Sequence, residues 1–153
     1  MKSIDGNYVP KEVLLVEDSP GDVRLTMEAF RDANAPIHLH VVSDGVEAME
    51  FLKKGGDRAS APRPDLILLD LNLPRMDGRE VLAQIKADPI LRMIPTIILT
   101  TSEAEADIAK SYQLQASCYL SKPGQLGAFE SLMKSISEFW LQSATLPPQR
   151  SIT

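Results

Sequence analysis

The sequence predicts an α/β fold, a doubly wound five-stranded parallel sheet in the order 2-1-3-4-5 with helices on both faces. Strand-like and helix-like segments alternate along the chain, which is the pattern of βα units on a parallel sheet. The segments 13–16 and 66–69 are entirely apolar, as expected for strands that are buried on both faces. With 153 residues the chain can form one domain with a substantial core, and it is too short for two.

The bulk composition excludes several classes of function. The formal net charge is -5 and the pI is near 5.0, so no positive field attracts the protein to nucleic acid. No apolar segment is long enough to cross a bilayer, and the first residues lack the apolar core of a signal peptide. The single cysteine, Cys118, cannot form an internal disulfide, which fits a reducing compartment. We therefore expect a cytoplasmic protein without a nucleic-acid or membrane partner.

Five segments are expected as strands, with helices between them. These segments are 13–17, 37–43, 66–70, 96–100 and 117–120. The first helix is predicted to begin with Ser19 as N-cap and Pro20 at the first helical position, where the missing N–H of proline costs no hydrogen bond. Val23, Met27 and Phe30 follow at helical spacing, so we expect them to face the core.

Two further helices are predicted from residues that cap helix N-termini. The second helix begins at Asp44, and Glu47 follows three residues later, as in a capping box. Ser102 and Glu105 repeat this spacing ahead of the fourth helix. In both places a side-chain oxygen is expected to accept a hydrogen bond from an unpaired N–H of the first turn.

The last helix carries more apolar surface than one face of a sheet needs. Its core stripe has helical spacing and consists of Phe129, Met133, Ile136 and Trp140. Leu132 and Phe139 lie on an adjacent line and widen this surface, which the sheet or the C-terminal tail would otherwise cover. We expect a homodimer that uses this face, with Leu132, Phe139 and Trp140 in the interface.

Three segments are expected to lack regular structure. They are a polar lead at 1–10, a long exposed loop at 53–64 that contains two glycines and two prolines, and a proline-containing tail at 143–153. The domain is therefore expected to span residues 11–142. No pattern of an output domain, such as a helix-turn-helix, follows it.

Acidic residues stand at the carboxyl ends of two predicted strands. Glu17 and Asp18 close the first strand, and Asp70 closes the third. Right-handed crossovers put these two strands side by side, so the three carboxylates should converge. An all-oxygen set of this kind suits a hard divalent cation, chiefly Mg²⁺. The alternative is that the acids only cap the following helices, but three acids at matched strand ends favour a metal site.

A hydroxyl and an ammonium are predicted at the same edge of the sheet. Thr100 ends the fourth strand, and Lys122 follows the fifth. Together with a metal ion they could contact the three oxygens of a phosphoryl group beside Asp70. Phosphoryl transfer asks a protein mainly for positioning and charge neutralisation, which this set supplies. Asp70 is then the expected nucleophile, and it would form an acyl phosphate.

Four motifs in this order resemble the receiver domain of two-component response regulators. They are the segments 15–18, 70–78, 98–100 and 119–123, which read LVED, DLNLPRMDG, ILT and YLSKP. The resemblance covers approximately residues 12–141 and implies a flavodoxin-like fold.

The resemblance also implies roles for individual residues. Asp70 would accept a phosphoryl group from the phosphohistidine of a sensor histidine kinase. Asp18, Asp70 and the main-chain carbonyl of Asn72 would bind Mg²⁺, with Glu17 acting through water. Lys122 would pair with the phosphoryl group. The protein would then catalyse only its own phosphorylation and dephosphorylation, and would not be an enzyme acting on another substrate.

A conformational switch is a further implication of the resemblance. The hydroxyl of Thr100 would move toward the phosphoryl group, and the ring of Tyr119 would turn into the vacated space. Without the resemblance, Tyr119 would be interpreted as a half-buried strand residue. The Lys122–Pro123 bond would be cis, and Gly78 would allow the turn into the third helix.

A narrower resemblance links the chain to the single-domain regulators that are paired with cyanobacterial and bacterial phytochromes. It rests on the short length, the long loop at 53–64 and the aromatic ending Phe139-Trp140-Leu141 that precedes two prolines. The kinase partner would then be a red/far-red photoreceptor.

Three other functions compete with this interpretation. A Mg²⁺-dependent aspartyl phosphohydrolase usually has a second acid two residues after its nucleophile, where this chain has Asn72. A flavin-binding module would need a phosphate loop after the first strand, where Glu17 and Asp18 would repel a phosphate. A pseudo-receiver that acts unphosphorylated is disfavoured by the complete set of site residues.

Overall fold

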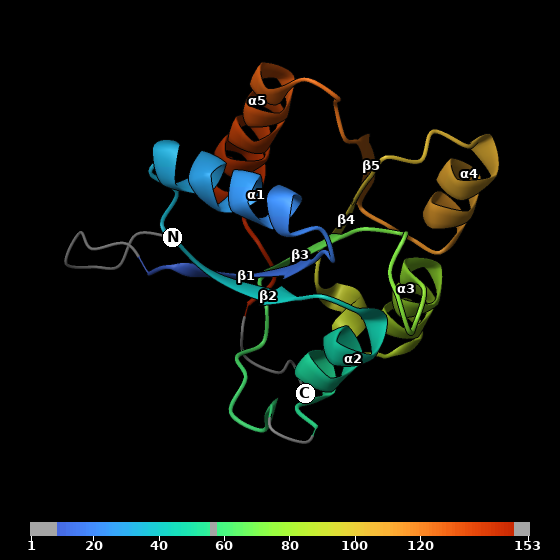
Figure 1. The fold of residues 1–153 in the computed structure, drawn as a ribbon. Coiled ribbons are helices and arrows are strands. Elements are labelled where there is room, and N and C mark those ends of the chain that lie inside the picture. Colours follow the sequence, from blue (N-terminus) through green and yellow to red (C-terminus); the bar gives the residue numbers. More distant parts are fainter. Residues whose placement is uncertain (1–8, 56–57, 149–153) are drawn as a thin grey trace.

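The strands of the computed structural model form the predicted sheet. In residues 9–55 and 58–148, which the structure describes, five parallel strands lie in the order β2-β1-β3-β4-β5 (Figure 1). Their bounds are β1 Lys11–Val16, β2 Ile37–Val42, β3 Leu66–Leu69, β4 Thr96–Thr100 and β5 Cys118–Ser121. The predicted fold class and strand order are confirmed. Of the predicted strand bounds, only those of β4 agree with the structure. The other strands differ by one or two residues at an end, because a strand ends where its ladder of hydrogen bonds stops.

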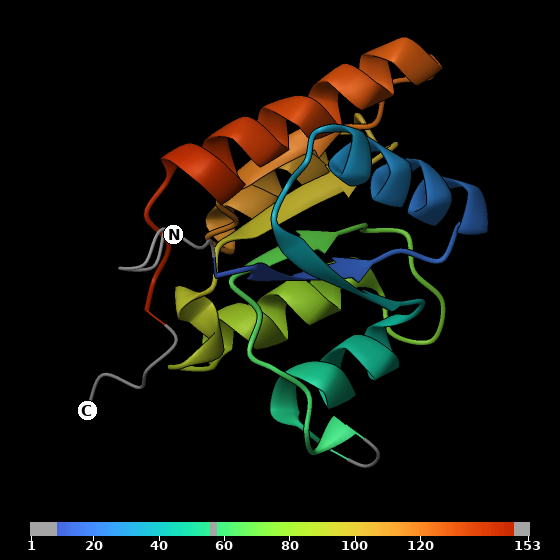
Figure 2. The same ribbon diagram turned by 90° about the vertical axis from the view of Figure 1, so that its left-hand side faces the viewer.

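Helices cover both faces of the sheet. They are α1 Pro20–Asp32, α2 Gly45–Lys53, α3 Gly78–Ala87, α4 Glu105–Gln113 and α5 Leu126–Ile136. Helices α1 and α5 lie on one face, and α2 and α3 lie on the other, as both views show (Figures 1 and 2). Helix α4 packs beside β5. A short 3₁₀ segment, Leu91–Met93, precedes β4.

The core consists of two apolar layers separated by the sheet. Successive residues of a strand point to opposite faces, so Val13 and Leu15 pack with α1 and α5, whereas Leu14 and Val16 pack with α2 and α3. All four residues of β3 are fully buried. The apolar runs in the sequence are therefore explained by burial on both faces.

Helix α1 begins as predicted, but its buried face differs from the prediction. The Ser19 hydroxyl accepts a hydrogen bond from the N–H of Asp22, and proline occupies the first helical position. The buried residues of α1 are Thr26, Ala29 and Phe30. The expectation for Met27 was wrong, because this residue is 51% exposed. The small Thr26 takes the inward position next to it, and its buried hydroxyl is satisfied by donating to the carbonyl of Asp22.

The predicted N-cap is confirmed for α2 and wrong for α4. Asp44 caps α2 by accepting a hydrogen bond from the N–H of Glu47. Helix α4 begins at Glu105 after Ala104, which provides no side-chain cap. The Ser102 hydroxyl instead accepts from the N–H of Ala104 and donates to the carboxylate of Asp107. The contact with Asp107 thus draws Ser102 away from the predicted capping role.

The last helix continues beyond α5 as a π-helical segment, η3, Ser137–Ser143. Within it the N–H of Ala144 donates to the carbonyl of Phe139, five residues earlier, at 2.7 Å. A π-helical turn holds more residues than an α-helical turn, so the apolar stripe shifts by one position. Leu141 is consequently buried at 2% exposure, and Trp140, predicted in the stripe, lies half-buried at its edge.

The segments outside the regular elements agree only partly with the predictions. In residues 54–55 and 58–64 there is no strand or α-helix, as expected. This loop is less exposed than predicted, because Ala61 packs on the core and Arg58 pairs with Glu47 at 2.8 Å. Residues 144–148 lack regular structure, and the predictions for 1–8 and 149–153 concern residues outside the described part of the chain. No helix in the described part of the chain is long and apolar enough to cross a membrane.

Candidate functional site

Three carboxylates meet at the carboxyl edge of the sheet. Glu17 and Asp18 follow β1, and Asp70 follows β3, which pairs with β1 in parallel. One oxygen from each carboxylate lies within 4.8 Å of the others. Asp18 is exposed, whereas Glu17 and Asp70 are buried at 3% and 7% exposure. The predicted convergence of these acids is therefore confirmed, and one member of the group faces solvent.

The ammonium of Lys122 lies among these carboxylates. Its Nζ donates to Asp70 Oδ2 at 3.1 Å and also to the carboxylate of Glu17. A third hydrogen bond goes to Asp22 Oδ2 at 2.8 Å, and the Lys122 side chain is only 6% exposed. All three donor positions of the ammonium are thus used by carboxylates.

Asp22 also belongs to this site, although it was not predicted as a site residue. Its carboxylate accepts a hydrogen bond from Lys122. Asp22 lies in the first turn of α1, which starts at the same edge of the sheet as Glu17 and Asp18. The signal that could have identified it is an acid in the first turn of a helix that begins directly after Glu17 and Asp18.

Burial and pairing raise the pKa of both Glu17 and Lys122, for different reasons. Desolvation raises the pKa of Glu17 to about 7, against the opposing hydrogen bond and charge of Lys122. Burial disfavours the charge on Lys122, but hydrogen bonds to Asp22 and Glu17 outweigh it and raise the pKa of Lys122. No buried side-chain nitrogen or oxygen of the described residues lacks a hydrogen-bond partner. The cluster is therefore a satisfied but strongly anionic site with one fixed cation.

Two glycines fix the loop that carries Asp70. A Cβ atom on Gly78 would overlap the carbonyl oxygen of Asp70 and the backbone of Leu71. The N–H of Gly78 also donates to the carbonyl of Leu71 at 2.9 Å. On the other side, a Cβ on Gly45 would overlap the carbonyl of Met76. Gly78 is thus required for close packing of α3 on the loop.

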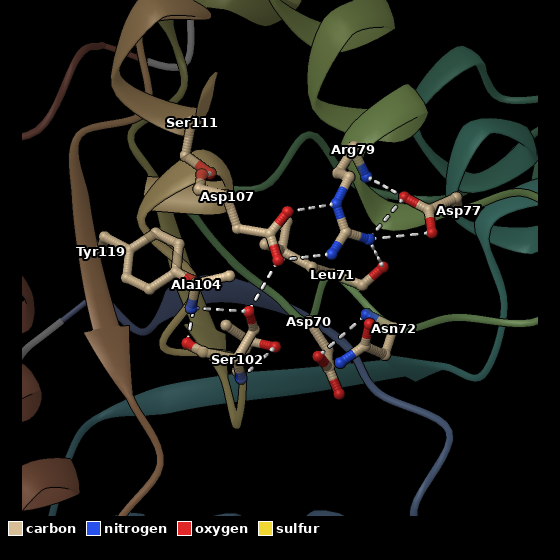
Figure 3. Close-up of polar contacts among 11 residues, drawn as sticks. Asp70, Leu71, Asn72, Asp77, Arg79, Ser102, Ala104, Asp107, Ser111 and Tyr119 are labelled. Atoms are coloured by element: carbon tan, nitrogen blue, oxygen red, sulfur yellow. Dashed lines mark hydrogen bonds and ion pairs between the residues drawn. The ribbon is translucent and has the colours of Figure 1, made fainter. Parts of the chain in front are cut away.

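Thr100 is the last residue of β4, and Tyr119 lies in β5, which pairs with β4. Thr100 is fully buried, and its hydroxyl accepts a long hydrogen bond of 3.5 Å from the N–H of Ser102. Tyr119 is half-buried against the core, and its hydroxyl donates to the carbonyl of Ser102 at 2.9 Å (Figure 3). Ser102 therefore connects the two residues that were predicted to form a switch.

The Lys122–Pro123 bond was expected to be cis, but it is trans. None of the peptide bonds in the described part of the chain is cis. The trans form of an X–Pro bond is favoured by about 0.5–1 kcal/mol in the absence of other constraints. The N–H of Lys122 donates to the carbonyl of Thr100 at 2.8 Å, which keeps Lys122 in register with β4 while the bond is trans.

Comparison with known proteins identifies the family. The response regulator receiver domain family matches residues 13–137. The chain belongs to this family. The resemblance drawn from the four sequence motifs is therefore confirmed.

Individual receivers are similar over nearly the whole chain. Response regulator Rcp1 of Synechocystis sp. is 47% identical over 143 residues, which are 94% of this chain and 97% of Rcp1. The crystal structure of the Mn²⁺-bound form of Rcp1 has a TM-score of 0.88 and covers 91% of this chain and 100% of that one. The phosphorylated cyanobacterial phytochrome response regulator RcpA is 50% identical, with a TM-score of 0.89, covering 92% of this chain and 100% of RcpA. The narrower resemblance to phytochrome regulators is confirmed by these similarities.

The residues of this receiver fit a divalent cation. Receiver domains bind divalent cations, and Glu17, Asp18 and Asp70 supply the hard oxygen donors that such ions prefer. The exposure of Asp18 leaves the group accessible from solvent. Asp70 is oriented from both sides, because Oδ1 accepts from the N–H of Asn72 at 3.1 Å and Oδ2 accepts from Lys122.

The raised pKa of Glu17 predicts that cation binding by this receiver depends on pH. A cation needs the carboxylate form, so a proton competes with it below about pH 7, where the apparent affinity should fall. The affinity should level off as the pH rises above this pKa. Calorimetric titration with Mg²⁺ at about pH 6, 7 and 8 in buffers of different ionisation enthalpy measures both the affinity and the released proton.

Glu17→Gln is the control for this prediction. The variant should bind Mg²⁺ more weakly but with little pH dependence across the same range, because its side chain does not titrate. A wild-type affinity that stays constant from about pH 6 to 8 would contradict the assignment of the raised pKa to Glu17.

Proposed function

We propose that this receiver domain, residues 11–142, accepts a phosphoryl group on Asp70 from the phosphohistidine of a sensor histidine kinase. Proteins of this family are signalling proteins, and we propose that this one acts by protein contact and catalyses only its own phosphorylation and dephosphorylation. The observation that carries the proposal is the arrangement around Asp70. Its carboxylate lies 3.1 Å from a buried ammonium and among acids that suit a divalent cation.

The proposed reaction is an in-line transfer between two nucleophiles. An oxygen of Asp70 attacks phosphorus, the O–P bond forms, and the N–P bond of phosphohistidine breaks, leaving its electron pair on the imidazole. The ammonium of Lys122 and the hydroxyl of Thr100 stabilise the phosphoryl oxygens. Mg²⁺ is the expected cation, and when bound by Asp18, Asp70, the Asn72 carbonyl and, through water, Glu17, it supplies further charge neutralisation.

The proposed output of phosphorylation is a change around Thr100 and Tyr119. The Thr100 hydroxyl would exchange its long hydrogen bond with Ser102 for a phosphoryl oxygen, and Tyr119 would repack beside it. Because these residues belong to β4 and β5, the change would alter the surface formed with α4 and α5.

We propose a phytochrome-type kinase as the phosphoryl donor and a cytoplasmic location for both. RcpA, which is 50% identical to this chain, is described as a phytochrome response regulator. A purified, autophosphorylated phytochrome kinase should transfer its phosphoryl group at least about tenfold faster than a histidine kinase of another sensor class, a barrier difference of about 1.4 kcal/mol. Transfer is measured by loss of radiolabel from the kinase. Equal rates from both kinases would contradict the pairing but not the acceptor role of Asp70.

We also propose that the protein forms a homodimer through the last helix. Phe139 is 57% exposed and makes a T-shaped ring contact with Trp140, with the ring centroids 5.3 Å apart, and the partly buried Leu132 precedes them on α5. Phe139→Asp should shift the molar mass in multi-angle light scattering from dimer toward monomer, because it places a charge in the apolar face. Ile90→Asp is the matched control, since Ile90 is similarly exposed, at 53%, on another surface. An unchanged mass for Phe139→Asp would remove the proposed interface.

A further inference from the structure

A pair of ionic hydrogen bonds joins α3 to α4 near the site. The Arg79 guanidinium in the first turn of α3 donates from Nε to Asp107 Oδ1 and from Nη2 to Asp107 Oδ2, each at 2.7 Å (Figure 3). This bidentate arrangement is the strongest geometry for an arginine–carboxylate pair. The Arg79 hydrogen bond, and then that of Ser102, hold the pKa of Asp107 at about 2. Asp107 is therefore charged, and the ion pair is intact at neutral pH.

Hydrogen bonds link this ion pair to the residues of the predicted switch. Asp107 Oδ2 also accepts a hydrogen bond of 2.6 Å from the hydroxyl of Ser102. The main chain of Ser102 in turn accepts from the Tyr119 hydroxyl and donates to the Thr100 hydroxyl. A series of hydrogen bonds thus runs from α3 through α4 and Ser102 to both switch residues. Figure 3 shows the part that joins Arg79, Asp107 and Ser102.

Apart from the contacts of Asp107, helix α4 is attached near its C-terminal end, where the Tyr112 hydroxyl accepts a hydrogen bond of 3.1 Å from the N–H of Tyr119. Within this helix, all of which the structure describes, Ser111 is the only buried residue. Its N-terminus lacks a side-chain cap, and the loop before it is instead held by the bond from the N–H of Ala104 to the Ser102 hydroxyl. The position of α4 therefore depends strongly on the contacts that Asp107 makes.

We propose that Arg79 and Asp107 are positioning residues that couple the Thr100–Tyr119 switch to helix α4 through Ser102. The inference rests on the proposed function, because it takes Thr100 to be the residue that senses the phosphoryl group. When the Thr100 hydroxyl leaves the Ser102 amide, Arg79 keeps α4 attached to α3, so the change reaches Tyr119 through a defined path. Without Arg79, the phosphoryl group can still bind at Asp70, but Tyr119 no longer reports it.

The experiment measures the ring signals of labelled tyrosine by NMR, before and after addition of Mg²⁺ and beryllofluoride, which mimics a phosphoryl group. Wild type should bind the mimic and shift the Tyr119 signal. Arg79→Gln should bind it but lose most of the shift. The Asp107→Arg variant should behave similarly, because it removes the carboxylate that accepts hydrogen bonds from both Arg79 and Ser102.

A second readout needs no ligand. Hydrogen exchange at the N–H of Ala104 should become faster by about fivefold or more in Arg79→Gln, the low end of coupling between linked sites. Arg24→Gln is the matched control, because Arg24 is 80% exposed and only loosely paired, at 4.0 Å, with Glu28. Ser102→Ala interrupts the series without changing a charge, and it serves if the charge variants fail to fold.

The outcomes separate the two proposals. If wild type does not bind beryllofluoride, the proposed function fails. If wild type and Arg79→Gln both bind it and show the same Tyr119 shift, the coupling role of Arg79 is overturned while the function stands. Loss of the shift in Arg79→Gln, Asp107→Arg and Ser102→Ala, with mimic binding retained, supports the coupling.

Discussion

Asp70→Asn should abolish phosphorylation by a small phosphodonor in the presence of Mg²⁺. An amide oxygen is neutral and a poor nucleophile, and it cannot form the acyl phosphate. Asparagine preserves the size of the side chain, so the hydrogen bond from the N–H of Asn72 can persist and the variant should fold. Intact mass spectrometry after incubation with acetyl phosphate measures the added phosphoryl group directly.

Asp32→Asn is the control for this experiment. Asp32 is an exposed acid at the last turn of α1, far along the helix from the cluster, and its removal should leave labelling unchanged. Labelling of Asp70→Asn at the wild-type level would show that another residue accepts the phosphoryl group, and the proposed function would then need a different acceptor.

Lys122→Met should strongly destabilise the protein in the absence of a divalent cation. The Lys122 ammonium lies among the carboxylates of Glu17, Asp22 and Asp70, and its side chain is only 6% exposed. Removing one partner of a buried ion pair leaves uncompensated charge and costs about 3–5 kcal/mol. Urea unfolding in a chelating buffer, followed by circular dichroism, measures this loss in the free energy of unfolding.

Mg²⁺ should restore part of the lost stability, because a bound cation replaces some of the missing positive charge and ligand binding stabilises the folded state. Lys134→Met is the control. Lys134 is 68% exposed and lies 4.0 Å from an exposed Glu138, so its removal should change the free energy by no more than about 0.5 kcal/mol. If Lys122→Met matches wild type with and without Mg²⁺, the ammonium does not hold the carboxylates together.

The sheet and the acidic cluster could be predicted because each depends on a short-range rule. Apolar runs such as Leu66–Leu69 mark strands that are buried on both faces, and the carboxyl ends of parallel strands meet at one edge. Asp70 was therefore placed beside Glu17 from the sequence alone. Those rules concern neighbouring strands, and they need no knowledge of how a helix is rotated.

The features that the sequence did not reveal depend on helix placement. Met27 and Thr26 differ by a rotation of about 100° on α1, and only the packing of that helix selects which faces the sheet. Trp140 does not lie in the core stripe, because the π-helical segment Ser137–Ser143 changes the number of residues per helical turn. Arg79 and Asp107 are 28 positions apart in the sequence and lie on different helices, so no local pattern indicates their pairing.

Close packing at two glycines restricts the loop that carries Asp70, whereas β4, β5 and α4 have no such restriction from these glycines. Neither Gly45 nor Gly78 can carry a methyl group without overlapping this loop, so α2 and α3 pack closely on its main chain at Met76 and at Asp70. Any rearrangement that follows phosphorylation should therefore pass through β4, β5 and α4, where the Thr100 and Tyr119 hydroxyls each make one hydrogen bond with Ser102. A downstream protein that distinguishes the phosphorylated from the unphosphorylated regulator should accordingly dock on the surface formed by β4, β5 and α4. Substitutions on α2 should leave its binding intact.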